Sequence, residues 1–385
     1  MEIAKKSIKE HRKYRGKFEI HSKMPLQNKR HLSIAYTPGV GAVSSLVAKN
    51  PKYVWNVTAK QNMVAVVSDG SAVLGLGNIG PLGALPVMEG KAVLFKRFAN
   101  IDAVPIVLAT QDVDEIISAV KWIAPTFGGI NLEDISAPRC FEIETRLIKE
   151  LDIPVFHDDQ HGTAIVVLAA LFNALKVAGK NLGKIKIVIS GAGAAGTAVA
   201  KLLIASGSKN ILILDSQGIV AAGRKGLTLE KRELAHLTNR KNIQGDLTAA
   251  LVGADVFIGV SKPGILKPEM IKTMAARPII FALANPIPEI MPVDAKKAGA
   301  YVVATGRSDF PNQINNSLVF PGFFRGLLDG RIGKVTQGMK LNAASALAGL
   351  IKKPSREKIL PGAFDKRTVP AIARAVIRSL GRSRS

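Results

Sequence analysis

Two pairs of neighbouring carboxylates are the residues of this chain best suited to metal chemistry. Glu133-Asp134 follows the apolar run 129–132, and Asp158-Asp159 follows the apolar residues 155–156. Because α/β sheets build their sites at strand ends, we expect all four carboxylates to emerge there. Oxygen ligands of this kind suit Mg²⁺ or Mn²⁺. A single acidic pair is more often a turn or a helix cap, but a nucleotide-binding signature nearby favours the metal.

That signature is a glycine turn, 191–196, which follows the predicted strand 185–189. Gly191 would permit the tight turn, Gly193 would let the backbone approach a pyrophosphate, and Gly196 would allow close packing of helix on strand. Ala194 and Ala195 lie between them, where the helix N-terminus would face the phosphates. The position between two predicted strands favours a dinucleotide site over an ordinary βα turn.

The residue that closes the next predicted strand, Asp215, bears on the choice of dinucleotide. An acid there would bind the 2′-hydroxyl of the adenosine ribose and repel a 2′-phosphate, which favours NAD over NADP. Arg224 and Lys225 lie close downstream and could neutralise a phosphate. The prediction is therefore NAD, with NADP kept open.

Four further polar residues could act on a substrate, although spacing alone selects none of them. Lys91 stands at a predicted helix start, and a lysine in a closed site beside a cation can lose its proton and serve as a base. Tyr36 precedes a Pro-Gly turn and could donate a proton. Asn285 and Asn316 suit a substrate carboxylate, because an amide would not compete for the metal, but both also suit turns.

His157 and His161 are four residues apart, as in a zinc-binding helix. That motif needs a glutamate after the first histidine, and Asp158 stands there instead. We therefore exclude zinc hydrolysis and expect both histidines to be structural or to support the metal ligands.

The elements that would position these residues alternate between strand and helix. Short apolar runs predict strands at 63–67, 103–108, 129–132, 155–156, 185–189, 210–215, 256–260, 279–283 and 301–304. The opening, to about residue 50, is expected to form a basic helix followed by an extended loop. Helices are expected at 92–98, 112–124 and 195–205, and the apolar stretch 164–178 is expected to be a buried helix. The predicted class is α/β with mostly parallel sheets. We expect a substrate domain at 1–157, a Rossmann-type doubly wound domain at 158–330 and a helical C-terminal segment at 331–385.

The composition indicates the class of protein, its cellular compartment and its partners. Apolar residues make up 47% of the 385 residues and charged residues 21%, which is typical of a globular protein of two domains. Cys140 is the single cysteine, so we expect no internal disulfide and a cytoplasmic location, without a membrane span. A net charge of +24 could attract polyanions, but aromatic residues are only 5%, and we expect no nucleic-acid partner.

Taken together, these motifs resemble the malic enzymes, specifically their short bacterial and archaeal form. The resemblance covers roughly residues 10–330 and rests on segments 35–40, 67–70, 74–81, 86–91, 133–134, 157–163, 191–196, 284–286 and 315–316. It implies oxidative decarboxylation of L-malate to pyruvate and CO₂ with reduction of NAD or NADP, together with decarboxylation of oxaloacetate. It also suggests a homodimer.

The resemblance assigns roles to the candidate residues. Glu133, Asp134 and Asp159 would hold Mg²⁺ or Mn²⁺ against malate, and Lys91 would accept the proton of the C2 hydroxyl. Tyr36 would protonate C3 of enolpyruvate. The remaining roles are Asp158 as an orienter of Lys91 or a ligand, and Asn285 and Asn316 as substrate-binding residues, with Asn285 also near the cofactor.

Two other functions remain open on the sequence. An amino-acid dehydrogenase would share the two-domain plan but need no metal. A non-enzymatic polyanion-binding protein built on this scaffold would have no need for the complete set of Tyr36, Lys91 and the acidic residues. Larger family members carry an arginine before the glycine-rich stretch, where this chain has 71–73 as Ser-Ala-Val. The cation for the second malate carboxylate is therefore open.

Overall fold

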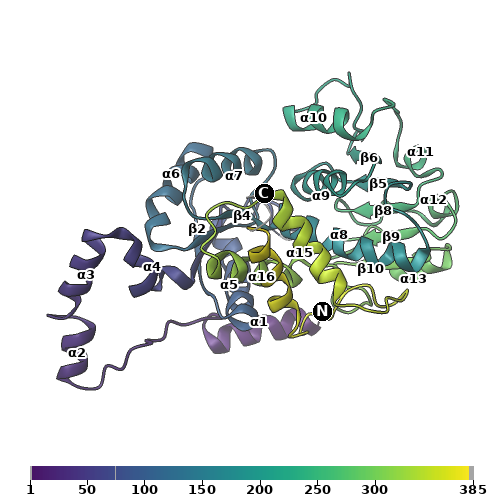
Figure 1. Cartoon of the computed structure of the whole chain (residues 1–385). Helices are drawn as coiled ribbons and strands as arrows, with labels where there is room; N and C mark the ends of the chain where they lie inside the picture. The colour runs from purple at the N-terminus through teal and green to yellow at the C-terminus, as the bar shows by residue number, and fades with distance from the viewer. Residues whose placement is uncertain (1, 74, 381–385) are drawn as a thin grey trace.

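The computed structural model describes residues 2–73 and 75–380, so Leu74 of the glycine-rich segment lies outside the described residues. Two parallel sheets lie at either side of a long central helix, α8 (Asp158–Ala178) (Figure 1). α8 is long and apolar enough to span a membrane, but 72% of its most apolar window is buried within the fold. It is the buried helix that the sequence predicts, and it begins at Asp158 directly after a strand.

The first sheet has the strand order β2-β1-β3-β4, and all its strands are parallel. The strands are β1 (Met63–Ser68), β2 (Asp102–Val107), β3 (Gly129–Leu132) and β4 (Val155–His157). Val64 and Val66 face α5 (Gly80–Ala99), whereas Ala65 and Val67 face α6 (Val113–Ile123) and α7 (Arg139–Glu150). Because helices cover both faces, the strands are continuous apolar runs, as the sequence predicts.

The second sheet has the order β10-β9-β8-β5-β6-β7, with only β7 antiparallel. Its strands are β5 (Lys186–Ser190), β6 (Asn210–Asp215), β7 (Gly218–Ile219), β8 (Val256–Gly259), β9 (Ile279–Ala282) and β10 (Val302–Thr305). The sequence predicts five of these within about a residue at each end, and it misses β7. The order reverses at β5, which is where open α/β sheets bind ligands.

Helices cover both faces of this sheet. α8 and α9 (Ala194–Ala205) share a core with Ile187 and Ile189, while the opposite face of β5 packs with the short helices. The helices of the second domain after α9 are α10 (Leu229–Thr238), α11 (Leu247–Leu251), α12 (Pro268–Lys272) and α13 (Pro292–Lys297). The fold is therefore the α/β doubly wound class that the sequence predicts.

The C-terminal helices return to the first sheet. They are α14 (Phe320–Asp329), α15 (Gln337–Gly349) and α16 (Thr368–Arg378), and the 3-10 turn η4 (Asn316–Leu318) precedes them. Phe320 and Phe324 of α14 pack on Phe95 of α5, with ring centroids 4.6 and 5.3 Å apart. α15 packs on α8. The domain limits given above stay a prediction, because these helices tie the two sheets together.

Two segments differ from expectation. α5 begins at Gly80 and continues through Pro86, so Lys91 lies in mid-helix and not at a helix start. After the basic helix α1 (Glu2–Tyr14), the expected loop contains two helices, α2 (Lys29–Ala35) and α3 (Val40–Lys49). The chain then returns to β1 through η1 (Pro51–Tyr53), α4 (Val54–Val57) and η2 (Ala59–Asn62), and η3 (Ala124–Thr126) follows α6.

Residues 24–50, which include α2 and α3, are called the arm below. Figure 1 shows the arm projecting from the left side of the molecule, away from both sheets. No residue of the arm is buried. The described residues of α1, η1, α4 and η2 are likewise not buried, whereas α5, α6 and α7 each bury one side against the first sheet.

Candidate active site

The three expected metal ligands come together at the carboxyl edge of the first sheet. Glu133 and Asp134 follow β3, and Asp159 lies in the first turn of α8, directly after the neighbouring strand β4. One carboxylate oxygen from each lies within 4.8 Å of the others. The backbone N–H of Asp134 donates to Asp159 Oδ2 at 2.8 Å, which fixes the two segments against each other. This arrangement offers a divalent cation three hard oxygen donors.

Lys91 points into the same site from α5. Its Nζ lies 2.7 Å from Glu133 Oε1 and 2.7 Å from Asp158 Oδ2, and 4.4 Å from the centroid of the Phe320 ring. The side chain is 8% exposed. α5 therefore places one ammonium between two carboxylates and against an aromatic face, which restricts its position to a small volume.

The charges of this site shift its pKa values. Burial would lower the pKa of Lys91, but Asp158, Glu133 and Asp159 outweigh it and hold the pKa above the ordinary lysine value. Burial raises the pKa of Asp158 to about 6, against the influence of Lys91. Burial and the neighbouring carboxylates also raise the pKa of Glu133 well above its ordinary value. The lowered lysine pKa expected from the sequence therefore requires additional positive charge.

A divalent cation fits this requirement. Burial, with a further contribution from the neighbouring carboxylates, raises the pKa values of Glu133 and Asp158, so an added positive charge would stabilise their ionised forms. The donors are all carboxylate oxygens, which suits Mg²⁺ or Mn²⁺ better than a soft metal. The histidine expected near them, His157, is fully buried, and its Nδ1 is 3.8 Å from Asp159 Oδ2.

Asp158 and Asn316 both lie close to Gly162 of α8. A Cβ at position 162 would lie 1.8 Å from Asp158 Oδ1 and 3.2 Å from the Cβ of Asn316. Gly162 therefore leaves room for the Asp158 carboxylate to lie back against the helix, where Lys91 reaches it. The same space brings η4, with Asn316, beside the carboxylates.

Glu144 of α7 holds the first turn of α8 and was not identified from the sequence. Its carboxylate accepts the backbone N–H of His157 at 2.9 Å, Gln160 Nε2 at 3.1 Å and His161 Nε2 at 2.9 Å. Lys340 of α15 lies 3.0 Å from the other ring nitrogen of His161. Burial would raise the pKa of Glu144, but His161 and the nearby cations lower it to about 2. The His161 ring is thus held by Glu144 and Lys340, whereas neither ring nitrogen of the buried His157 has a hydrogen-bond partner among the described residues.

Glu144→Ala is expected to reduce the free energy of unfolding by about 3–5 kcal/mol, because three buried donors lose their charged acceptor. The turn that carries Asp158 would loosen, so kcat should fall as well. Thermal and urea unfolding would measure the first effect. Glu142→Ala is the control: Glu142 is exposed on the same helix, so its loss should change the free energy of unfolding by less than about 0.5 kcal/mol. Equal effects of the two variants would refute the role given to Glu144.

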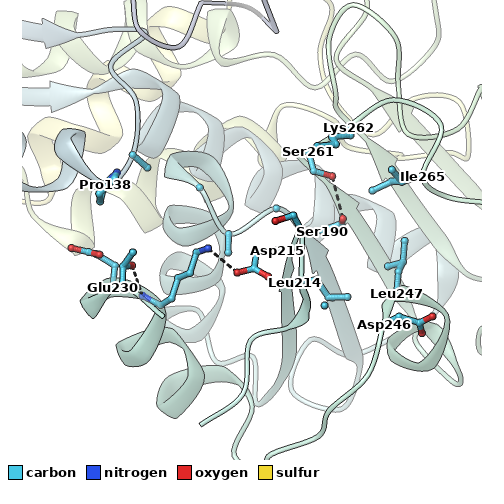
Figure 2. A pocket seen from close by; sticks show the side chains of 18 of the residues that line it. Pro138, Ser190, Leu214, Asp215, Glu230, Asp246, Leu247, Ser261, Lys262 and Ile265 are labelled. Atoms are coloured by element: carbon cyan, nitrogen blue, oxygen red, sulfur yellow. Dashed lines mark hydrogen bonds and ion pairs between the residues drawn. The ribbon is translucent and has the colours of Figure 1, made fainter. Parts of the chain in front are cut away.

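The expected dinucleotide site is a cavity of about 590 Å³ at the switch point of the second sheet. Figure 2 shows Ser190, Leu214 and Asp215 lining it from β5 and β6, with Ser261 hydrogen-bonded to Ser190. Pro138 from the first domain closes one side.

The glycine turn has the geometry that the sequence predicts. Gly191 has φ +119°, and a Cβ there would lie 2.6 Å from Val260 O. A Cβ on Gly196 would lie 1.7 Å from Gly191 O, whereas one on Gly193 would meet nothing within 4 Å. Gly193 therefore leaves open space for a phosphate. Ala194, Ala195 and Gly196 form the first turn of α9, whose N-terminus faces the cavity wall at Gly193.

Asp215 is engaged by two cations. Its Oδ2 accepts from Arg224 Nη2 and, at 2.7 Å, from Lys231 Nζ. The sequence suggested Arg224 and Lys225; the second partner is instead Lys231, which is brought in by α10. Lys231 lines the cavity together with Asp215.

Asn285 and Tyr36 are the two remaining candidate residues, and they lie in different parts of the structure. Asn285 lies where the domains meet, because a Cβ on Gly75 would be 2.1 Å from Asn285 O. Tyr36 is not brought to the site in the single chain. It ends α2 in the arm and is 67% exposed, and Figure 1 shows this end of the arm far from α5.

Asp69 and Asn131 are further buried residues that the sequence reasoning did not single out. Asp69 accepts from the backbone and hydroxyl of Ser71 and pairs with Arg139 at 2.9 Å. Asn131 donates to Glu133 Oε2 at 2.9 Å and so orients an expected ligand. The Ser-Asp-Gly triplet after β1 was the signal for Asp69, but nothing in the sequence shows its burial.

Comparisons with known proteins agree with this geometry. The family model "Malic enzyme, N-terminal domain" matches residues 15–148, and "Malic enzyme, NAD binding domain" matches residues 160–380. The "Bifunctional malic/malolactic enzyme" of Bacillus subtilis is 54% identical over 382 residues, which is 98% of this chain and 93% of that protein. The "NAD-dependent malic enzyme" of Geobacillus stearothermophilus is 54% identical over 370 residues, 96% of this chain and 77% of that protein. The crystal structure of the NAD-dependent malic enzyme from Thermotoga maritima superimposes with a TM-score of 0.93 at 51% identity, covering 96% of this chain and 98% of the other.

Proposed function

The chain belongs to the malic enzyme family, whose reaction is the oxidative decarboxylation of malate with NAD(P), and on this premise we propose which groups perform each step. Glu133, Asp134 and Asp159 hold Mg²⁺ or Mn²⁺. Lys91 is the base and Tyr36 the acid. Asp158 positions Lys91, and Asn285 and Asn316 bind substrate. The nicotinamide cofactor binds in the cavity at the glycine turn 191–196.

Lys91 takes the proton of the C2 hydroxyl while hydride leaves C2 for the nicotinamide. A bound divalent cation would neutralise the carboxylates that raise the pKa of Lys91, polarise the C2 oxygen and stabilise the enolate formed when CO₂ leaves. Asp158 and the Phe320 ring keep the Nζ in place through this step. Tyr36 then donates its phenolic proton to C3 of enolpyruvate. The second half of this sequence also supports decarboxylation of added oxaloacetate.

The observation that carries the proposal is the contact of Lys91 with Glu133, one of the three clustered carboxylates Glu133, Asp134 and Asp159 at the edge of the first sheet. Neither an amino-acid dehydrogenase nor a polyanion-binding protein needs a cluster of metal-binding oxygens facing a buried lysine. The test is absorbance of reduced nicotinamide with L-malate and Mn²⁺, with NAD or NADP, before and after a chelator. Metal-dependent reduction with matching pyruvate formation supports the proposal. No reduction by folded protein with either cofactor would refute it.

We infer a preference for NAD, although relatives named NAD-dependent and NADP-dependent both occur. Asp215 is the supporting residue, since its carboxylate lines the cavity and would repel a 2′-phosphate. The expected preference is limited, because Arg224 and Lys231 already offset that charge.

Asp215→Asn is expected to raise the ratio of kcat/KM for NADP to that for NAD by about tenfold or more, a change of about 1.4 kcal/mol per tenfold. The variant removes the negative charge and frees two cations for the phosphate. Steady-state rates with both cofactors measure the ratio. Asp246→Asn is the control, because Asp246 lines the same cavity without contacting either cation. An unchanged ratio in Asp215→Asn would remove this residue from cofactor selection.

The remaining proposals concern the oligomeric state of the enzyme, its location and its products. We propose a homodimer that acts in the cytoplasm on L-malate and releases pyruvate and CO₂. The free, buried Cys140 is compatible with a reducing compartment. No nucleic-acid partner is proposed for the basic surface.

A further inference from the structure

A further cavity, of about 470 Å³, lies where helices of both domains and of the C-terminal segment meet, and it is called the second cavity below. Its walls are α7 of the first domain, α9 and α10 of the second, the first turns of α8 and the start of α15. Phe141 and Glu230 line both this cavity and the dinucleotide cavity, so the two adjoin. In the described part of the chain, no residue assigned to the metal, the substrate or the glycine turn lines it. The proposed reaction therefore leaves the second cavity without a role.

Lys340 of α15 brings a cation to one wall of the second cavity. Its Nζ lies 3.0 Å from His161 Nδ1, and in the described part of the chain it forms no ion pair. The charge of Glu144 raises the pKa of Lys340, but burial outweighs it and lowers that pKa to about 8. An ammonium has three donors, and His161 accepts one of them. Lys340 is therefore a partly buried ammonium that lacks an anionic partner.

Thr197 of α9 brings a hydroxyl to the same cavity. The residue is 3% exposed, and among the described residues its Oγ1 has no hydrogen-bond partner. Such hydroxyls are rare in native proteins, because burial removes their bonds to water without replacing them. Lys340 and Thr197 thus present two donors to the cavity, and both lack an acceptor.

The other charges of the lining restrict what this acceptor is. Four glutamates line the cavity, at positions 142, 144, 230 and 233, against the cations Arg146, Lys201 and Lys340. Arg146 and Lys201 are already paired with glutamates, at 3.1 and 2.8 Å, so Lys340 is the one cation of the described lining without a carboxylate. A ligand with several negative charges would be repelled by the glutamates. A single negative charge matches the one free ammonium.

Apolar side chains in the same lining indicate what the charge is attached to. Phe141, Ala164 and Leu202 offer a short hydrocarbon chain a surface away from water. We propose that the second cavity binds a small monocarboxylate, with its carboxylate held by Lys340 and Thr197 and its carbon chain on Phe141 and Leu202. This site is separate from the proposed catalytic groups, so it is tested without turnover.

An occupant of the second cavity would contact the residues that support the active site. Lys340 lies against His161, which is hydrogen-bonded to Glu144, and Glu144 accepts the backbone N–H of His157. The ligand would thus bind beside the contacts that fix the first turn of α8, and not at the carboxylates that this turn carries into the active site.

Propionate is the probe, in a saturation-transfer NMR titration of the full chain with divalent metal chelated and no dinucleotide present. Under these conditions the active site offers propionate only Lys91, which is already paired with two carboxylates. We expect saturable binding with a dissociation constant of about 1 mM or lower. Each added methylene, from acetate through propionate to butyrate, should tighten binding by about threefold, because the chain leaves water. A protein that shows no saturable binding of propionate overturns the proposal.

Thr197→Val is the sharper of two variants, because the hydroxyl that it removes has no partner among the described residues. Its melting temperature should match that of the wild type. Its dissociation constant for propionate should rise by about tenfold or more, as expected for the loss of a hydrogen bond to a charged group. An unchanged dissociation constant in this folded variant would contradict the site.

Lys340→Met should also raise the dissociation constant by about tenfold or more, since the carboxylate loses its cation. Lys201→Met is the matched control: Lys201 lines the same cavity but is paired with Glu233, so the constant should change by less than about threefold. An equal loss in the two lysine variants would place the anion at Lys201 and overturn the assignment to Lys340. Inorganic phosphate that binds more tightly than butyrate would overturn the monocarboxylate class, because the glutamates should repel a dianion.

Discussion

Replacing Lys91 by alanine is expected to lower kcat for malate oxidation by about 10²–10⁴-fold, the range for loss of a positioned acid or base. The Nζ lies 2.7 Å from both Glu133 Oε1 and Asp158 Oδ2, which positions the amine at the carboxylate cluster. NAD binding should be retained, because the cavity at the glycine turn is lined by other residues. Stopped-flow hydride transfer and fluorescence titration with NADH would measure the two properties separately.

The variant needs two controls, because removing Lys91 leaves buried carboxylates without their cation. Breaking such a pair costs about 3–5 kcal/mol, so circular dichroism must show that the protein is folded at the assay temperature. Lys91→Met retains the apolar stem on Phe320 and should be as inactive as Lys91→Ala. Lys96→Ala, an exposed ion-paired lysine on the same helix, should keep full activity. Wild-type rates in folded Lys91→Ala would show that the base is another group.

The sequence predicted the parallel strands well because most of them are buried on both faces of a sheet. Such strands are apolar runs with clear ends, and the polar residues at those ends gather at one edge by geometry alone. For this reason the pairs Glu133-Asp134 and Asp158-Asp159 could be grouped without a structure, and the resemblance then selected Glu133, Asp134 and Asp159 as the metal ligands. The glycine turn 191–196 was equally clear, since only glycine tolerates the close approach of the Gly191 carbonyl to position 196.

Elements that depend on packing were not predictable in the same way. The Gly- and Pro-rich start of α5 has low helix propensity, but burial of Met88 and Phe95 holds it as helix through Pro86. Glu144 lies on an amphipathic helix, where a glutamate normally faces solvent. Its burial arises only because α7 lies against the start of α8.

The helices of the arm were not predicted from the sequence for a different reason. Proline and glycine follow Tyr36, so an extended loop was the natural interpretation, although Val40, Val43 and Val47 have the i, i+3, i+7 spacing of a helix. The resemblance nevertheless placed Tyr36 in the active site. In the structure Tyr36 is 67% exposed on the arm, so its role in the reaction stays a prediction.

Asp159→Asn is expected to remove metal dependence together with activity, lowering kcat by about 10³-fold or more, since a bound metal contributes several kcal/mol of stabilisation to the transition state. Asparagine retains an oxygen that can accept the N–H of Asp134, so the substitution removes charge and leaves the hydrogen bond in place. Isothermal titration with Mn²⁺ alone would show the loss of binding without relying on turnover.

Stability with and without Mn²⁺ distinguishes a metal site from a purely structural ion-pair cluster. Whether the cluster binds a metal or serves only as an ion-pair partner of Lys91, Asp159→Asn relieves repulsion on Glu133, whose pKa is raised by burial and by the neighbouring carboxylates. The metal-free variant should therefore be more stable than the metal-free wild type. Only a metal site predicts that Mn²⁺ stabilises the wild type more than the variant. Mn²⁺ at 100 times its dissociation constant should stabilise the wild type by about 2.7 kcal/mol, and Asp159→Asn should lose most of this gain. Asp152→Asn, on an exposed residue before β4, should keep it. A Mn²⁺ effect equal in all three proteins would mean that the ion binds elsewhere and that the carboxylates serve only to hold Lys91.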